Sequence, residues 1–217
     1  MQAITIRNRY LGARYTFFKW RYNLVLVNKL GLALTMAFLT GLMAQIRIYL
    51  PFSPVPITGQ VFAVLLSGVI CGGLFGSLSQ LIYIGLGIAG IPWFAAFSPA
   101  YGHLFASPTG GYLIGFVIAP WLIGRYTDRY IGARTFFSQI RLMMLGVGVI
   151  YISGAVVLAL VMRLTLWQTL LMGVVPFILV DLIKAALAAS VSWAILPRNS
   201  YNGEIDKSDP ANPVRKR

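Results

Sequence analysis

Two charged residues interrupt a long apolar stretch in the last quarter of the sequence. Asp181 and Lys184 lie in residues 164–197, which contain no other Asp, Glu, Lys or Arg. A spacing of three residues places both side chains on one face of a helix, where they can form an ion pair. Their carboxylate and ammonium offer hydrogen-bond acceptors and donors side by side. Such a pair suits a neutral ligand that carries both kinds of group, for example a cyclic urea or amide.

The alternative interpretation is a buried pair that only fixes helix packing. A charge near the centre of a bilayer costs about 2.5–3.5 kcal/mol on insertion scales. Two such charges with no further use would make this helix hard to insert. Pairing reduces that cost, and a role in ligand binding gives the pair a function, so we favour a polar site inside a helix bundle.

The composition of the chain indicates what surrounds this pair. Hydrophobic residues make up 58% of the sequence and charged residues 11%, whereas soluble domains carry roughly 25% charged residues. Residues 48–124 contain no Asp, Glu, Lys or Arg. A folded chain of this composition is stable where lipid replaces water around it. The sequence therefore predicts an integral membrane protein.

The apolar segments predict the architecture. A spanning helix needs about 20 residues, and six segments meet or approach that length, which gives an all-α, six-transmembrane-helix bundle. The second and third segments are short and are expected to tilt or to line a cavity. The predicted domains are an N-terminal arm (1–28), the membrane domain (29–197) and a polar tail (198–217). The six segments are 29–49, 60–71, 76–90, 109–126, 139–162 and 167–196.

The distribution of basic residues predicts the orientation. With six spans, fifteen of the 18 Lys and Arg fall on one side: up to the start of the first span, from the end of the fourth to the start of the fifth, or after the sixth. Only Arg47 and Arg163 fall on the other side. Because cytoplasmic segments are enriched in Lys and Arg, both termini are expected in the cytoplasm and the protein in the cell membrane. Basic and aromatic residues alternate in the arm, which favours an anchor at the membrane surface over a nucleic-acid site.

Two loops on the predicted outer side are candidates for the ligand site. Residues 51–60 hold three prolines within six residues, which exclude a helix and favour extended backbone. This loop, with Thr58 and then Gln60 at the start of the next span, predicts a wall or lid over an outward-facing pocket; an interfacial turn is the alternative. The loop 90–108 is rich in aromatic residues, including Trp93, which indicate either a membrane belt or stacking on a ligand ring.

Small residues recur every four positions along three predicted spans. Such spacing lets helix backbones approach closely, and packing within the chain explains most of it. The stripe of Ala33, Ala37 and Gly41 on the first span is instead a candidate for contact with another protein.

Several classes of protein are excluded by what the sequence lacks. There is no G-x-x-x-x-G-K-[ST] motif, so the chain does not hydrolyse ATP through a P-loop. A single cysteine and a single histidine cannot form a metal cluster of the usual kind. No carboxylate pair or nucleophile motif indicates catalysis. We therefore predict no enzyme activity, no catalytic residue and no metal.

Four motifs in order give the sequence a specific resemblance to a known family. It resembles the BioY family, the biotin-specific S components, or substrate-binding subunits, of energy-coupling factor (ECF) transporters. The resemblance covers about residues 29–196. The motifs are PVPITGQ at 54–60, GLGIAGIPWF at 85–94, PTGGYLIGF at 108–116 and PFILVDLIKA at 176–185.

The resemblance implies a fold, a ligand and partners. It implies a six-helix S component that binds biotin from the outer side, with no cofactor. Asp181 and Lys184 would bind the biotin head group. A transmembrane coupling subunit would dock on Ala33 and Ala37, and two ATPase subunits would supply the energy. The biotin-site residues predicted in this way are Asp181, Lys184, Gln60, Thr58, Tyr112 and Trp93.

The sequence leaves open which group binds the biotin carboxylate. The candidates are Arg47, Tyr112, Lys184 and backbone N–H groups near 109–111. Two other functions also stay open at this point: an S component for a different small vitamin, and a structural membrane subunit that binds no small molecule.

Overall fold

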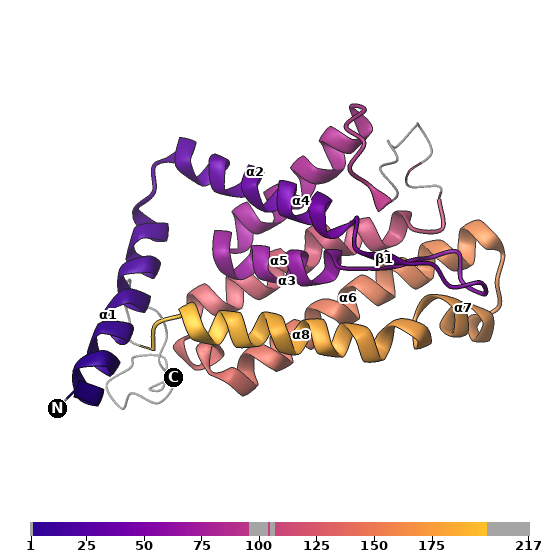
Figure 1. The fold of residues 1–217 in the computed structure, drawn as a ribbon. Helices are drawn as coiled ribbons and strands as arrows, with labels where there is room; N and C mark the ends of the chain where they lie inside the picture. Colours follow the sequence, from indigo (N-terminus) through magenta and orange to yellow (C-terminus); the bar gives the residue numbers. More distant parts are fainter. Residues whose placement is uncertain (1, 96–103, 105–106, 199–217) are drawn as a thin grey trace, which may run out of the picture.

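The fold is built almost entirely of helices (Figure 1). The computed structural model describes residues 2–95, 104 and 107–198, with side chains from residue 9 onward; of the predicted tail, 199–217 lie outside these residues. Its elements, in order, are α1 (Gln2–Asn23), α2 (Leu26–Met43), β1 (Arg47–Ile48), β2 (Ile57–Thr58), α3 (Gln60–Cys71), α4 (Gly73–Ile88), α5 (Gly110–Arg129), the short 3₁₀ helix η3 (Ile131–Arg134), α6 (Phe136–Met162), α7 (Leu166–Gly173) and α8 (Val175–Ile195).

The helices pack side by side along one long axis. Helix α5 packs on α6, α4 and α3, and α8 packs on α6 and α3, while α2 covers α4 and α3. Figure 1 shows α1 crossing one end of this bundle, beside the C-terminal end of α8, and β1 and α7 at the opposite end. The prediction of an all-α bundle is confirmed, and each predicted span corresponds to a helix or a pair of helices.

The helices differ in their ability to cross a membrane. Among the described helices α2, α6 and α8 are long and apolar enough to span a bilayer. Helices α3 and α4 are apolar but have only 12 and 16 residues. Ten residues of α3 are buried, so this helix lies inside the bundle and does not face lipid, as its length suggested.

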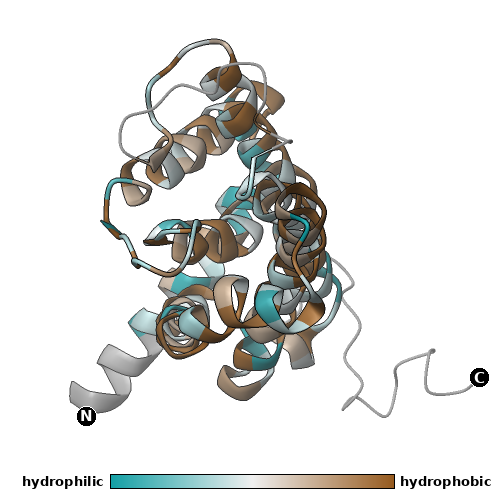
Figure 2. Cartoon of the chain, turned by 90° about the vertical axis from the view of Figure 1, so that its right-hand side faces the viewer, coloured by the Kyte–Doolittle hydropathy of each residue, from teal (hydrophilic) through white to brown (hydrophobic). Residues whose placement is uncertain are grey.

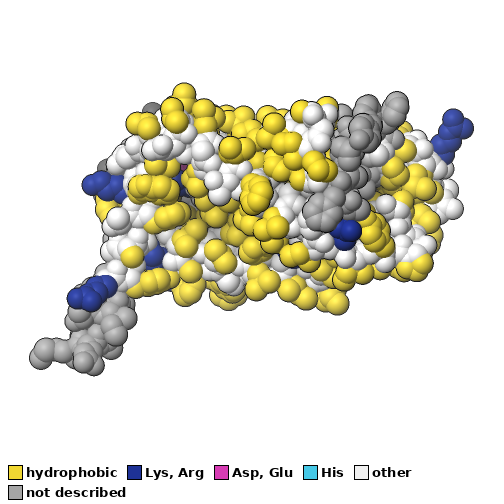
Figure 3. Space-filling view, turned by 45° about the horizontal axis from the view of Figure 1, so that its top comes forward, with side chains coloured by type: hydrophobic (Ala, Val, Ile, Leu, Met, Phe, Trp, Pro, Cys, Tyr) yellow, Lys and Arg dark blue, Asp and Glu magenta, His cyan; other side chains and the backbone are white. Residues whose placement is uncertain are grey.

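The outer surface of the bundle is apolar, as lipid requires. Large hydrophobic side chains stand exposed on its flanks, for example Phe38 at 63%, Ile152 at 69% and Leu160 at 73%. Figure 2 shows hydrophobic residues on the outer faces of the helices, and Figure 3 shows hydrophobic side chains spread across the middle of one face. Exposure of such a surface to water is unfavourable, whereas the hydrocarbon core of a bilayer solvates it.

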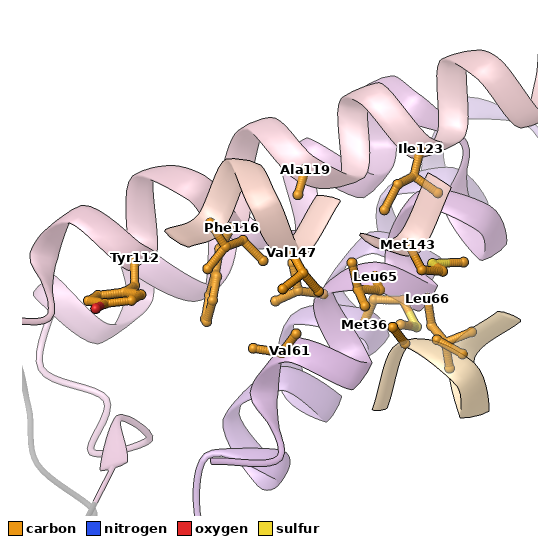
Figure 4. Close-up of a cluster of buried hydrophobic side chains, with 14 of the residues drawn as sticks. Met36, Val61, Leu65, Leu66, Tyr112, Phe116, Ala119, Ile123, Met143 and Val147 are labelled. Atoms are coloured by element: carbon orange, nitrogen blue, oxygen red, sulfur yellow. The ribbon is translucent and has the colours of Figure 1, made fainter. Parts of the chain in front are cut away.

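Glycines allow the helices in the centre of the bundle to touch. A Cβ atom at Gly68 of α3 would lie 2.6 Å from the carbonyl oxygen of Pro120 in α5, and one at Gly124 of α5 would lie 2.2 Å from the backbone nitrogen of Gly73. Helix packing within the chain, predicted from the small-residue spacing, is confirmed here. Around these contacts α3, α5 and α6 contribute the buried side chains that Figure 4 shows, among them Leu65, Ile123 and Val147.

We expect Gly124→Ala to destabilise the bundle. The new methyl group would meet the backbone of α3 and α4, which cannot yield as a side chain can, and overpacking of this kind costs about 1–3 kcal/mol. The thermal unfolding midpoint of the purified protein should fall by several degrees. The matched control is Gly148→Ala in α6, where a Cβ would meet nothing within 4 Å. An equal midpoint for the two variants would contradict the proposed close packing.

The sixth predicted span, 167–196, is wrong as one continuous helix, because it breaks at Val174 between α7 and α8. Pro176 has no N–H, so the carbonyl of Met172 loses its helical partner. The Ser53 hydroxyl donates to that carbonyl at 2.6 Å, and the Tyr112 hydroxyl donates to the carbonyl of Gly173 at 2.7 Å. The break therefore joins α8 to the proline loop and to α5.

The structure adds detail to the N-terminal part and corrects one prediction there. Helix α1 makes up most of the predicted arm, and α2 begins at Leu26, three residues before the predicted start of the first span. The Ala33, Ala37 and Gly41 stripe does not lie on the surface: both alanines are fully buried, and a Cβ at Gly41 would meet the Trp93 ring at 3.2 Å. The stripe packs within the chain because α2 lies directly on α4 and α3, so its prediction as a partner surface is not retained.

Candidate functional site

The proline loop is held as a hairpin at the end of the bundle opposite α1. Strands β1 and β2 pair antiparallel, with Arg47 opposite Thr58 and Ile48 opposite Ile57. The loop between them carries the prolines, and Ser53 fastens it to the α7–α8 break. This arrangement places Val55, Pro56 and Thr58 along the wall of a cavity, in agreement with the predicted wall or lid.

The cavity has a volume of about 440 Å³, within the range of small-molecule sites in proteins. Most of its wall is apolar and aromatic, from Phe94, Leu113, Phe116, Ile150 and Phe177. Its polar side chains come from the hairpin, the segment before α5, and helices α3, α5, α6 and α8. They are Tyr49, Thr58, Gln60, Ser107, Thr109, Tyr112, Tyr151, Asp181 and Lys184.

The predicted charged pair lies in this cavity and is joined by a third residue. The Lys184 ammonium donates to Asp181 Oδ1 at 2.7 Å, and the Tyr151 hydroxyl of α6 donates to Asp181 Oδ2 at 2.8 Å. Asp181 is 3% exposed. Each carboxylate oxygen thus receives one donor, and a carboxylate can accept about four. The ammonium has three donors, of which Asp181 takes one, so both groups can also bind a ligand.

A second polar group lies at the start of α3. The Thr58 hydroxyl donates to Gln60 Oε1 at 2.9 Å, and Gln60 Nε2 donates to the Tyr83 hydroxyl of α4 at 2.7 Å. Gln60 is buried and fixed from both sides. Both Thr58 and Gln60 line the cavity, where the orientation of the amide is set before any ligand enters.

Tyr112 forms part of the wall and ties α5 to α7. Its hydroxyl donates to the carbonyl of Gly173. Its ring lies against Gly154 of α6, where a Cβ atom would be 2.4 Å from the ring. Tyr112 thus lines the cavity with its hydroxyl proton already engaged within the chain.

Trp93 lies outside the cavity, unlike the other five predicted site residues. Its indole N–H donates to the carbonyl of Tyr83 at 2.9 Å, and its ring packs against Tyr83 with centroids 5.4 Å apart. Gly41 leaves the space for the ring on α2. Trp93 thus supports the wall from behind, while the neighbouring Phe94 lines the cavity. Composition could not separate these two adjacent aromatic residues.

The four candidates for an anionic ligand group are placed differently. The Arg47 guanidinium donates to Gln45 Oε1 at 3.1 Å and does not line the cavity. The Tyr112 hydroxyl is occupied. Thr109, next to the start of α5, and Lys184 do line it. Lys184 has further ammonium donors for the cavity, whereas the Ser107 hydroxyl donates to the carbonyl of Leu104 at 2.6 Å and lies 3.1 Å from the Thr109 hydroxyl.

Sequence reasoning missed Tyr151. Its helix is mostly apolar, and an aromatic residue in such a helix is usually part of the core. The signal that could have found it is the carboxylate in α8, because a buried Asp needs donors from neighbouring helices. No group of three or more His, Cys, Asp or Glu side chains that could hold a metal ion lies together among the described residues.

Comparison with known proteins supports a single family. The model of the BioY family matches residues 15–200. A protein of Methanothermobacter thermautotrophicus named "Probable biotin transporter BioY" is 45% identical over 65% of this chain and 94% of its own length. The Thermotoga maritima protein named "Biotin transporter BioY" is 35% identical over 67% of this chain and 83% of its own length.

The fold has a counterpart among solved structures. A crystal structure described as the S-component for biotin from an ECF-type ABC transporter superposes with a TM-score of 0.71, covering 77% of this chain and 89% of that one at 24% identity. With the family match over nearly the whole described chain, it follows that this chain belongs to the BioY family.

Proposed function

We propose that this chain is the biotin-binding S component of an ECF transporter and mediates biotin uptake. It is a multi-pass membrane protein and a transporter component, not an enzyme, and biotin is its transported ligand, not a cofactor. The observation that carries the proposal is the cavity in which a buried Asp–Lys pair faces an aromatic wall.

The chemistry of biotin fits the two parts of this cavity. The ureido ring of biotin has a carbonyl acceptor and two N–H donors. Asp181 accepts hydrogen bonds and Lys184 donates them, so together they can bind both sides of the ring. The apolar bicycle and chain would lie against Phe94, Phe116 and Phe177. Few polar contacts within an apolar wall are the usual design of a site for a small molecule.

The charge distribution supports an orientation with the cavity on the outer side. The cavity lies at the end of the bundle that carries β1 and α7, away from α1 and the C-terminal end of α8 (Figure 1). Most of the described Lys and Arg belong to α1, to residues 125–141 or to residue 198. Cytoplasmic segments are rich in these residues. We therefore propose cytoplasmic termini and a location in the cell membrane. The partners we propose are a transmembrane coupling subunit and two ATPase subunits.

Uptake of radiolabelled biotin tests this function. The chain would be expressed in biotin-auxotrophic bacteria without their own biotin transporter, together with a coupling subunit and either active or inactive ATPases. We expect uptake only with active ATPases, and an excess of unlabelled biotin should abolish it while thiamine or riboflavin should not. Competition by another vitamin, with no effect of biotin, would instead favour an S component for that vitamin.

We expect Tyr151→Phe to weaken biotin binding moderately. The change removes one donor to Asp181 but keeps the ring that lines the cavity, so the carboxylate loses one of the two contacts that fix its direction. The loss of such a hydrogen bond is worth about 0.5–1.5 kcal/mol, or roughly two- to tenfold in Kd. Tyr130→Phe, in the loop before η3 at the other end, is the control. Equal Kd values for Tyr151→Phe and the unmodified protein would remove Tyr151 from the site.

A further inference from the structure

Helix α1 is fastened across one end of the bundle by two buried arginines. Arg14 donates to the carbonyls of Trp193 and Leu196 at the C-terminal end of α8. Arg21 donates to the carbonyl of Val69 in α3 at 2.6 Å and forms an ion pair with Asp128 of α5. Both arginines are at most 5% exposed.

Phe18 completes the contact between α1 and the bundle. Its ring lies between two guanidinium groups, with Arg21 4.5 Å and Arg134 4.3 Å from the ring centroid. Positions 14, 18 and 21 share one face of a helix, and Phe18 is fully buried. This face of α1 therefore packs against the bundle. Its contacts fix the orientation of the helix, and with it the direction in which the side chains on its other faces point.

The other side of α1 is basic and aromatic. Arg9 and Lys19 are exposed, as is Trp20, at 49%. None of these three is on the face that carries Arg14, Phe18 and Arg21. Figure 1 shows α1 crossing the end of α8 and extending past the edge of the bundle, so this side is not covered by the other described helices.

The neighbouring helix ends add more positive charge at the same level. Arg125, Arg129, Arg141 and Arg198 are exposed. Three of them stack on aromatic rings: Arg125 on Trp121, Arg129 on Tyr130 and Arg198 on Trp193. We call these four arginines, with Arg9 and Lys19, the basic rim.

Of the two carboxylates in the described part of the chain, Asp128 pairs with Arg21 and Asp181 with Lys184. The six basic side chains of the rim outnumber these two carboxylates, and this excess of positive charge suits an anionic partner. The apolar flanks of the bundle begin directly beside the rim (Figure 3), and basic and aromatic residues at the border of such a surface are typical of contact with lipid headgroups.

We propose that the basic rim binds the phosphate headgroups of anionic phospholipids, with α1 lying along the membrane surface. The apolar flanks favour a lipid over an acidic protein or a nucleic acid, because a bilayer satisfies the apolar and the basic surfaces together. Arg14 and Arg21 act indirectly: they hold α1 in the position from which Arg9, Lys19 and Trp20 reach the headgroups.

The test is selective lipid binding by the full chain. The protein would be reconstituted in nanodiscs of equimolar phosphatidylcholine and phosphatidylglycerol, extracted in mild detergent, and analysed by native mass spectrometry for retained lipid. We expect phosphatidylglycerol to be enriched. Arg9→Gln and Lys19→Gln should each lower the enrichment, by roughly fivefold if each residue contributes as a basic residue near an anionic membrane usually does.

Controls separate lipid binding from other effects. Arg163→Gln, at the opposite end of the bundle, should leave the enrichment unchanged. Inorganic phosphate added to the detergent-solubilised protein should not displace the lipid, because the apolar flanks contribute nothing to its binding. Equal retention of the two lipids by the unmodified protein, or an equal loss in Arg163→Gln and Arg9→Gln, would overturn the proposal. Biotin affinity is independent of this result, since the cavity lies at the other end.

Discussion

Asp181→Asn should weaken biotin binding about tenfold to hundredfold while the protein still inserts and folds. Asparagine has nearly the same shape but no charge, and hydrogen bonds to charged groups contribute about 1.5–3 kcal/mol. It also has one acceptor oxygen where the carboxylate has two, so Tyr151, Lys184 and the ligand would compete for it. Isothermal titration of the purified variant with biotin measures the change in Kd.

The matched control for this change is Asp128→Asn. Asp128 is the other described carboxylate, and it is paired with Arg21 at the far end of the bundle. Its loss should lower the unfolding midpoint, since it leaves a buried arginine without its anion, but should leave the Kd for biotin unchanged. If Asp181→Asn and Asp128→Asn bind biotin equally well, the pair in α8 only serves packing.

Lys184→Met should have an effect of similar size. Methionine fills much of the same volume in an apolar site. The substitution removes the three N–H donors of the lysine ammonium, and Asp181 keeps Tyr151 as its described partner. We expect the Kd to rise at least about tenfold, in line with the loss of a charged donor to the ligand. The measurement is again calorimetric titration, after size-exclusion chromatography has shown a monodisperse protein.

Lys29→Met is the control for the lysine. Lys29 lies in α2 and does not line the cavity, so its loss should not alter the Kd. Combining Asp181→Asn with Lys184→Met gives a second check, because residues in one ion pair that bind one ligand are not additive. The double variant should lose less than the product of the two single effects, and full additivity would indicate that the two residues act at separate places.

The sequence was sufficient to predict the helix bundle and to single out two charged residues that line its cavity. Charged residues in a bilayer are costly, so Asp181 and Lys184, three residues apart in an apolar segment, indicated either an ion pair for packing or a ligand site. The structure places both residues in the cavity wall. The apolar segments likewise predicted the helices, because length and composition decide what lipid accepts. The prolines at 51, 54 and 56 excluded a helix, and the hairpin follows from that exclusion.

The remaining features depend on contacts between distant segments. The break at Val174 is stable because Ser53 and Tyr112 donate to the carbonyls that it exposes. Both donors lie far from Pro176 in the sequence, so the residues around the proline do not predict them. Tyr151 and Trp93 show the same limit. One is in the cavity and the other behind its wall because of how α6 and α2 pack, although both are aromatic residues in apolar surroundings.

The small residues Ala33, Ala37 and Gly41 on α2 form a pattern that is compatible with two kinds of contact. Small residues every four positions allow close approach of a neighbour, but the spacing does not say whether that neighbour is in the same chain. Here it is, because Ala33 and Ala37 are buried and Gly41 receives the ring of Trp93. The side chains that α2 exposes are instead large, such as Leu34 and Phe38.

A crystal structure of the full chain with biotin tests the central claim most directly. The account predicts electron density for biotin in the cavity, with the ureido ring about 3 Å from both the Asp181 carboxylate and the Lys184 ammonium and the bicycle against Phe116 or Phe177. Biotin bound elsewhere, or a ring in the cavity that touches neither charged group, would contradict it.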